Sequence, residues 1–344
     1  MMLDVPAPER PRGPVFLAAL GGAVSRAPIW LLAWLVPCLL ALVASGAWIG
    51  WFSQAAAHRL APGEAMAGLS DAFRFDHAQE LAVLRARTAD GTAVLGLLTM
   101  LFGVFAAGGW LQVFLERTSG HSVRRFLWGG SRYFWRFARV WILTLAVLAF
   151  ISWLWFGWPW KTLVLDVLFG LKGGDLEELT SGRTAVGVGW LQDGGYALSF
   201  ALTMLWADYT RTRLALLDTR SSLIAGLGTL GLLLRHPLRV VRPIALLFAL
   251  EVLLLKGAAA LAVPLNRGLD ASSTWHDVAL LFLVGELALI GRAIVHGASY
   301  HAAVSVSRDL VPPLPRPDPW AHRVGGPGGP QYPIDSSDEY GVSL

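Results

Sequence analysis

Residues 207–257 decide the fold of this chain, and they read ADYTRTRLALLDTRSSLIAGLGTLGLLLRHPLRVVRPIALLFALEVLLLKG. The stretch begins where one apolar segment ends, passes through a basic and weakly amphipathic part, and enters a second apolar segment. This order is typical of a helix that lies on a membrane surface before the chain enters the bilayer. The rest of the chain contains variations of the same unit. We therefore predict a protein that crosses the membrane several times.

The composition supports helical membrane spans and argues against other classes. Hydrophobic residues make up 55% of the 344 residues and charged residues only 15%, whereas soluble domains carry about 25% charged residues. The net charge of +4 is too small and too dispersed for a nucleic-acid partner. The single cysteine, Cys38, excludes an intramolecular disulfide. The expected fold class is all-α and polytopic.

Long apolar runs predict six transmembrane helices arranged as three hairpins. A helix that rises about 1.5 Å per residue needs about 20 residues to cross ~30 Å of hydrocarbon. The fourth run is the least apolar because it contains Asp193, which we place near the outer interface. The predicted spans cover residues 29–52, 92–115, 140–158, 186–207, 243–264 and 278–296.

The predicted membrane domain covers residues 15–311 and lies between two proline-rich ends. Residues 1–14 and 312–344 cannot bury enough apolar surface to fold, so we predict that both are disordered. The acidic residues Asp4 and Glu9 precede the first apolar run and argue against a cleavable signal peptide.

The arginines predict the orientation, because cytoplasmic loops carry an excess of basic residues. The segments on one side of the predicted spans hold 18 Arg, whereas those on the other side hold six Arg and two Lys, outweighed by twelve acidic residues. We therefore expect an inner-membrane protein with both termini in the cytoplasm. The basic side comprises residues 1–28, 117–139, 208–242 and 298–344, and the opposite side residues 53–91, 159–193 and 265–277.

The first, third and fifth spans share a similar lead-in. The three lead-ins are FLAALGGAVSRAP (16–28), FLWGGSRYFWRFAR (126–139) and LIAGLGTLGLLLRHP (223–237). They align without gaps when Arg26, Arg136 and Arg235 are superimposed, although their identity is weak. We interpret each as a surface helix in the cytoplasmic interface that turns into the bilayer. An ordinary cytoplasmic lead-in would look the same, so duplication of the three hairpins stays open.

The run DYTRTRLALLDTRSSLIAGLGTLGLLLRHP (208–237) and the run FLWGGSRYFWRFARV (126–140) carry a resemblance to known proteins. The chain resembles uncharacterised bacterial six-span integral membrane proteins of the YciC-like or glycerophosphodiesterase-membrane-domain type. The resemblance covers roughly residues 15–300 and rests on loose motifs. It implies a six-span topology and no activity, because this sequence contains no catalytic phosphodiesterase domain.

A glycine motif within the opening stretch imitates a nucleotide-binding fingerprint. Gly226, Gly228 and Gly231 match G-x-G-x-x-G, and Glu251 follows twenty residues later. No strand precedes the motif, Pro237 ends the following helix early, and Glu251 lies in an apolar run. We therefore expect these glycines to allow close helix packing, and we predict no cofactor.

Spans five and six carry the most informative charges, because ionised groups in hydrocarbon are usually paired or functional. Depths calculated at 1.5 Å per residue place Glu251 level with Arg292, and Lys256 level with Glu286. We predict these two ion pairs. The two charges on each helix lie ~120–140° apart around its axis, so both pairs cannot occupy the centre of the interface. A proton or ion path, or snorkelling without pairing, remains an alternative.

Arginines interleaved with aromatic residues predict a basic surface that contacts anionic lipids of the inner leaflet, rather than nucleic acid. Asp208 is expected to pair with Arg211, and Asp218 with Arg220 and Arg235. The residues expected on the lipid-facing basic surface are Arg124, Arg125, Arg132, Arg136, Arg139, Arg235, Arg239 and Arg242.

The sequence contains no H-E-x-x-H, C-x-x-C or G-x-S-x-G pattern, and no catalytic or metal site is predicted. The favoured function is a non-enzymatic membrane protein that interacts with lipids or with unknown protein partners. The alternative is a small-solute or ion transporter that uses the polar residues of spans five and six. An enzyme ranks third, because acid, base and metal-ligating groups do not gather in any one region.

Overall fold

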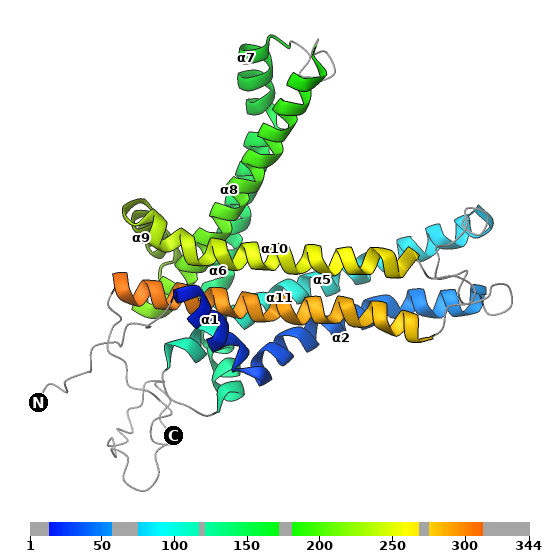
Figure 1. Cartoon of the computed structure of the whole chain (residues 1–344), viewed down its shortest axis with the longest axis horizontal. Coiled ribbons are helices and arrows are strands. Elements are labelled where there is room, and N and C mark those ends of the chain that lie inside the picture. Colours follow the sequence, from blue (N-terminus) through cyan, green and yellow to red (C-terminus); the bar gives the residue numbers. More distant parts are fainter. Residues whose placement is uncertain (1–13, 57–74, 117–120, 172–180, 268–274, 312–344) are drawn as a thin grey trace, which may run out of the picture.

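The computed structural model describes residues 14–56, 75–116, 121–171, 181–267 and 275–311, and within these ranges every regular element is a helix (Figure 1). The predicted disordered ends therefore lie outside the described residues, apart from Pro14. The helices are α1 (Val15–Val24), α2 (Ala27–Ala56), α5 (Ala78–Leu115), α6 (Ser122–Phe156), η1 (Trp160–Asp166), α7 (Val167–Phe169), α8 (Gly182–Leu217), α9 (Ser222–Arg235), α10 (Pro237–Arg267) and α11 (Trp275–Leu310).

Five stretches of helix in the described ranges are long and apolar enough to cross a membrane, and they contain α2, α5, α6, α10 and α11. The chain is thus an all-α polytopic membrane protein, as the sequence predicts. The fourth predicted span lies within α8, whose 36 residues are long enough to cross but do not reach the same apolarity. Gln192, Asp193 and the glycines around them lower its hydropathy. The count of six spans is therefore not reproduced by length and apolarity alone.

The long helices meet in one region of the molecule and extend from it as two separate groups (Figure 1). We call the meeting region the base; it contains α1, α9, the starts of α2, α6 and α10, and the ends of α5, α8 and α11. From the base, the outer parts of α2, α5, α10 and α11 run together as the main arm. The outer parts of α6 and α8, with η1 and α7, form a side arm that points in another direction.

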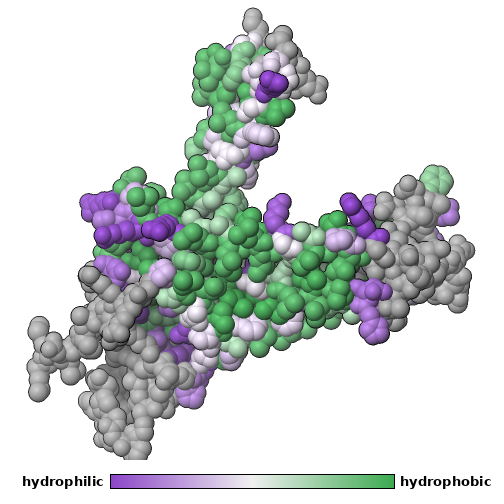
Figure 2. Space-filling view, in the orientation of Figure 1, coloured by the Kyte–Doolittle hydropathy of each residue, from purple (hydrophilic) through white to green (hydrophobic). Residues whose placement is uncertain are grey.

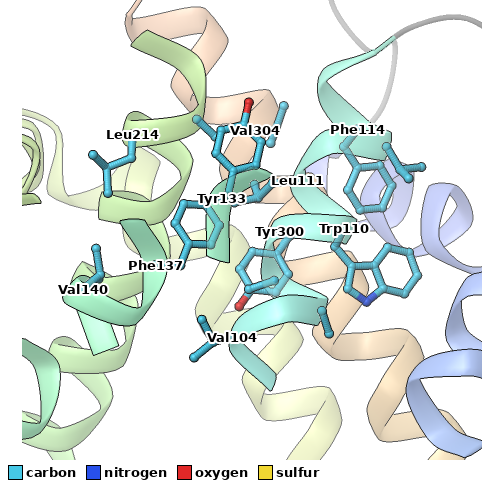
Figure 3. Close-up of a cluster of buried hydrophobic side chains, with 14 of the residues drawn as sticks. Val104, Trp110, Leu111, Phe114, Tyr133, Phe137, Val140, Leu214, Tyr300 and Val304 are labelled. Carbon is cyan, nitrogen blue, oxygen red and sulfur yellow. The ribbon is translucent and has the colours of Figure 1, made fainter. Parts of the chain in front are cut away.

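The packed core of the described residues lies at the base. Its largest cluster brings together side chains from α2, α5, α6, α8, α9 and α11. The bulkiest members, Trp110, Tyr133 and Tyr300, have almost no exposed surface (Figure 3). Both arms instead present many apolar side chains outward, and Figure 2 shows hydrophobic colour over much of both arms. Exposed apolar helices of this length require lipid around them.

Glycines bring α5 and α6 into close contact at the base. A Cβ added at Gly108 would lie 2.8 Å from the carbonyl oxygen of Gly129, and one added at Gly129 would meet Gln112 and the carbonyl oxygen of Gly108. A Cβ added at Gly109 would likewise meet the ring of Phe126, and one added at Gly130 would meet the ring of Phe105. The small residues of the second predicted span therefore let a neighbouring helix approach its backbone.

Two of the three lead-ins are separate short helices, and the third is not. α1 and α9 end just before α2 and α10 begin. The lead-in at residues 126–139 is continuous with its span as α6, so the prediction of a separate surface helix there is wrong. Pro28 and Pro237 follow the aligned arginines Arg26 and Arg235 by two residues, at the starts of α2 and α10. Proline interrupts helical hydrogen bonding there. Ala138 occupies the corresponding place in α6, and the helix continues.

Candidate functional site

An open groove of about 760 Å³ lies at the base between the start of α1, the first turns of α10 and the last turns of α11. Its volume is within the range of small-molecule sites, about 300–1,000 Å³. The lining combines apolar side chains with charged ones. The apolar lining residues are Pro14, Val15, Phe16, Leu238, Pro243, Leu246, Val306 and Leu310, and the charged ones are Arg239, Arg242, Arg308 and Asp309.

The groove carries a net positive charge, because three guanidinium groups face one carboxylate, Asp309. Arg239 and Arg242 are exposed and lie three residues apart in the first turns of α10, so they occupy neighbouring positions on one helix face. Arg308 is half-buried, and its Nη2 donates a hydrogen bond of 2.6 Å to the carbonyl oxygen of Leu115 at the end of α5. The groove therefore offers two solvent-accessible cations and one that α5 holds in place.

The start of α10 is fixed to the core beside the groove. The Tyr209 hydroxyl of α8 donates a 2.9 Å hydrogen bond to the carbonyl oxygen of Val240, which is fully buried. Leu205, Tyr209 and Val240 form one apolar cluster with Val306 of α11. One wall of the groove is thus a rigid part of the base.

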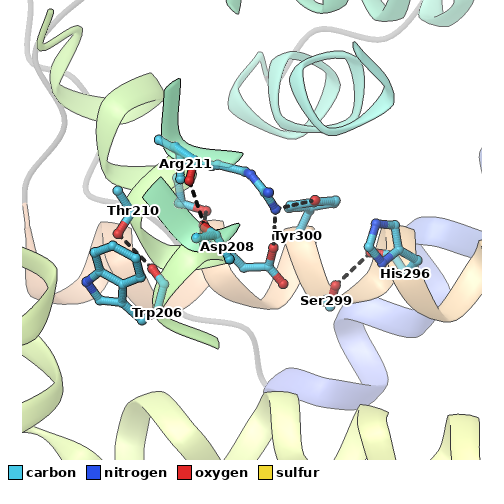
Figure 4. A network of polar contacts seen from close by, with 10 residues as sticks. Trp206, Asp208, Thr210, Arg211, His296, Ser299 and Tyr300 are labelled. Carbon is cyan, nitrogen blue, oxygen red and sulfur yellow. Dashed lines mark hydrogen bonds and ion pairs between the residues drawn. The ribbon is translucent and has the colours of Figure 1, made fainter. Parts of the chain in front are cut away.

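A polar network joins α8 to α11 next to this cluster (Figure 4). Arg211 Nη1 lies 2.9 Å from Asp208 Oδ1, which is the pair predicted from the sequence. The same nitrogen donates a hydrogen bond of 3.4 Å to the Tyr300 hydroxyl. Both ionic side chains are largely buried. The network cross-links the two helices where the arms separate.

Asp218 has different partners from those predicted. It ends α8 in a left-handed conformation with φ of 49° and receives ion pairs from Arg132 and Arg136 of α6. The prediction of Arg220 and Arg235 as its partners is therefore wrong. Both are exposed, because α6 crosses the end of α8 and supplies nearer cations. The pairing of Asp218 with Arg132 and Arg136 could not be predicted from residues close to Asp218 in the sequence.

The predicted basic surface is divided by the fold. Arg125 is buried, with 2% of its side chain exposed, and its Nε lies 3.1 Å from Glu116 Oε2, so its placement on a lipid-facing surface is wrong. The glycine contact between α5 and α6 turns this face of α6 into the core. Arg132 and Arg136 are half-buried against Asp218. The exposed members of the predicted surface are Arg124, Arg139, Arg235, Arg239 and Arg242.

Only one of the two predicted cross-pairs in the hairpin of α10 and α11 forms. Arg292 Nε lies 3.0 Å from Glu251 Oε1. The predicted pair of Lys256 with Glu286 does not form, because Glu286 turns toward α2. There it accepts a 2.7 Å hydrogen bond from Trp34 Nε1. The thiol of Cys38 lies 3.6 Å from the same oxygen.

The contacts of two arginines of the base were not predicted from the sequence. Arg308 lies beyond residue 296, where the sixth span was predicted to end, but α11 continues to Leu310. Arg26 donates a 2.7 Å hydrogen bond to the Gly22 carbonyl oxygen and lies 4.7 Å from the centre of the Phe114 ring. Burial, and then the nearby Arg125 cation, lower the pKa of Arg26. The break between the first lead-in and its span was the only signal for Arg26.

The glycine motif serves helix packing at two of its three positions. Gly226 faces Trp206, and Gly228 faces the guanidinium of Arg213. Gly231 has open space around it, so the packing interpretation does not extend to it. The motif lies inside the helix α9 rather than between a strand and a helix, which excludes the nucleotide fingerprint. Within the described ranges, no three His, Cys, Asp or Glu side chains gather to hold a metal ion.

Comparisons with known proteins add no relative. No family model, curated protein or solved structure matches this chain. The resemblance to YciC-like membrane proteins therefore stays a prediction, and any functional conclusion rests on the geometry of the groove and the arms.

Proposed function

We propose that this membrane protein binds an anionic phospholipid in the groove between α1, α10 and α11. The observation that carries the proposal is the lining itself, which sets Arg239, Arg242 and Arg308 beside apolar side chains from all three helices. A phospholipid has the matching chemistry, because its phosphate accepts charge-assisted hydrogen bonds from guanidinium groups. Its acyl chains match the apolar walls.

The proposed position in the membrane agrees with this ligand. The Arg-rich segments of the sequence belong to the base, so we place the base at the cytoplasmic face of the inner membrane. Anionic lipids of that leaflet attract basic residues near the surface by about 1 kcal/mol for each residue. The outward aliphatic side chains of α9, such as Leu223, Ile224 and Leu227, suit a helix lying in the same interface.

Lipid retention measured by native mass spectrometry tests the proposal. The purified protein would be titrated with phosphatidylglycerol and, separately, with phosphatidylcholine. We expect a preference for phosphatidylglycerol that the double substitution R239Q/R242Q weakens about 30-fold, the effect of losing ~2 kcal/mol. The matched control is R139Q/R235Q, which removes two exposed arginines of the base outside the groove.

Equal losses in the two double variants would show that any basic residue of the base serves, and would refute a specific groove. Equal retention of the two lipids by the unsubstituted protein would refute anionic selectivity. A melting temperature unchanged by R239Q/R242Q would show that the variant is folded.

A second candidate function, transport of a proton or small ion, is favoured by one observation. Glu286 is a half-buried carboxylate within an apolar helix, and its contacts are an indole N–H and a thiol rather than a cation. A carboxylate at such depth is a candidate for reversible protonation. Proton flux into proteoliposomes that E286Q abolishes and E251Q retains would support transport. Flux equal to that of empty liposomes would eliminate it.

A further inference from the structure

Within the predicted spans, two charged side chains make neither an ion pair nor a hydrogen bond with the described residues. Asp193 of α8 and Lys256 of α10 are both exposed, and within the described ranges neither makes an ion pair or a hydrogen bond. Glu251, by contrast, is paired with Arg292. An ionised group on a membrane helix is unfavourable in hydrocarbon, and the cost rises to about 2.5–3.5 kcal/mol at the helix centre on insertion scales. Asp193 and Lys256 therefore favour a binding partner that supplies a cation to the first and an anion to the second.

The two charges lie at equal distances from the point where the arms separate. The hydrogen bond from Tyr209 to Val240 fixes that point. Asp193 precedes Tyr209 by sixteen residues in α8, and Lys256 follows Val240 by sixteen residues in α10. At a rise of about 1.5 Å per residue, each charge lies ~24 Å along its arm. When both arms make the same angle with the membrane normal, the two side chains lie at the same depth in the bilayer.

The arms hold these charges apart within one molecule. The side arm points away from α10 (Figure 1), and apolar side chains are exposed along both arms, including Trp190 and Leu198 on α8 and Leu253 on α10. The missing partner thus has to present an anion to α10 and a cation to α8, each within an apolar surface. A second copy of this chain meets both requirements.

We propose that two copies associate through the side arm of one and the α10 face of the other, with Asp193 of each copy paired to Lys256 of its partner. A two-fold axis along the membrane normal moves each residue to the same depth in the second copy. Only charges at matching depth can pair across such an axis, and the pairing is then reciprocal. The association also covers apolar surface on both arms. It involves none of the groove residues, so it stands independently of lipid binding.

Disulfide trapping between two separately tagged full-length chains in liposomes tests the contact. Both chains would carry C38S, which removes the single native thiol. One chain would carry D193C and the other K256C, so that a disulfide between the two tags can only join two molecules. We expect a cross-linked dimer after mild oxidation. The matched control is L198C with K256C, which offers an exposed site on the same helix at a different depth.

Charge exchange provides the second arm of the test. We expect D193K alone and K256D alone each to weaken self-association about tenfold in single-molecule photobleaching, and D193K/K256D to restore it. Restoration also shows that the single variants fail through charge rather than through folding. The proposal is overturned if D193C and K256C are cross-linked no more strongly than L198C and K256C. It is also overturned if self-association is the same in the single variants, in D193K/K256D and in the unsubstituted protein. A chain that carries both D193C and K256C is tested separately. A disulfide within that chain and none between chains would show closure of the two arms and would also overturn the proposal.

Discussion

The base and the arms of this protein bury their apolar side chains in different ways. At the base, Trp110 and Tyr209 are each 1% exposed and are enclosed by protein. On the main arm, Leu42 is 61% exposed and Leu253 is 69% exposed. Lipid tails solvate such leucines as well as another helix does, so helices gain little from hiding them. The base therefore resembles the core of a soluble protein, while the arms depend on the bilayer.

The charges follow the same division. At the base, Glu116, Asp208 and Asp218 each have a cationic partner from the described residues. On the arms, Asp193 and Lys256 have none within the described ranges. Protein contacts satisfy these three carboxylates at the base, and a second copy is proposed to satisfy Asp193 and Lys256 on the arms.

The largest effect is expected at the buried ion pair of the base. Arg125→Met leaves Glu116 buried without its cation, and breaking such a pair costs about 3–5 kcal/mol. Thermal unfolding in a mild detergent should show a strongly lowered melting temperature. Arg139→Met, which changes an exposed arginine of the same helix, should leave the melting temperature nearly unchanged. A similar fall in melting temperature in the two variants would contradict the assignment of Arg125 to a buried face and Arg139 to an exposed face of α6.

The next largest effect is expected where α5 and α6 touch. Gly129→Leu places a side chain against the backbone of α5, and overpacking of this kind costs about 3 kcal/mol. Gly96→Leu adds the same side chain at a point of α5 with open space around it. We expect only the first substitution to lower the melting temperature. A tolerated leucine at residue 129 would contradict the glycine contact.

A smaller effect is expected where α8 fixes α10. Tyr209→Phe removes the hydroxyl that donates to the Val240 carbonyl oxygen, and a single hydrogen bond contributes about 1 kcal/mol. The same unfolding assay should show a modest fall in melting temperature. Tyr196→Phe on the side arm is the control, because no hydrogen bond involves the hydroxyl of Tyr196 among the described residues. An equal fall in both variants would mean that the hydrogen bond contributes nothing.

The smallest effect is expected on the arms. Phe282→Ala shortens a side chain that is 66% exposed, and no cavity forms where lipid can fill the space. We expect a change in the free energy of unfolding below about 0.5 kcal/mol, as for other exposed substitutions. Phe137→Ala at the base should instead cost about 3–5 kcal/mol, because its ring is fully buried. Comparable losses in both would mean that the arm is packed by protein.

The sequence predicted the features that depend on apolarity along the chain. The long apolar helices and the pairing of Glu251 with Arg292 both follow from segment length and depth. Proline placement also explains in retrospect why two lead-ins are separate helices and the third is part of α6. The sequence contains this difference in proline placement, but the alignment of the three lead-ins was too weak to predict two different structures from it.

The features that the sequence could not predict depend on how each helix is rotated and on which helices meet. Depth placed Lys256 level with Glu286, but the rotation that brings Glu251 to Arg292 turns Glu286 toward Trp34. Asp218 meets α6 rather than its sequence neighbours, because the lead-in at residues 126–139 crosses the base. The groove joins α1, α10 and α11 in the same way, and Arg308 entered it through an unpredicted extension of α11.

The contrast between the base and the arms is tested most directly by photo-leucine, which replaces leucine with little change in shape. The protein would be labelled throughout, reconstituted in liposomes, irradiated and mapped by mass spectrometry. We predict lipid adducts at Leu42 and Leu283 on the main arm, and crosslinks to protein at Leu111 and Leu214 in the base. Lipid adducts at Leu111 and Leu214, or protein crosslinks at Leu42 and Leu283, would contradict the division.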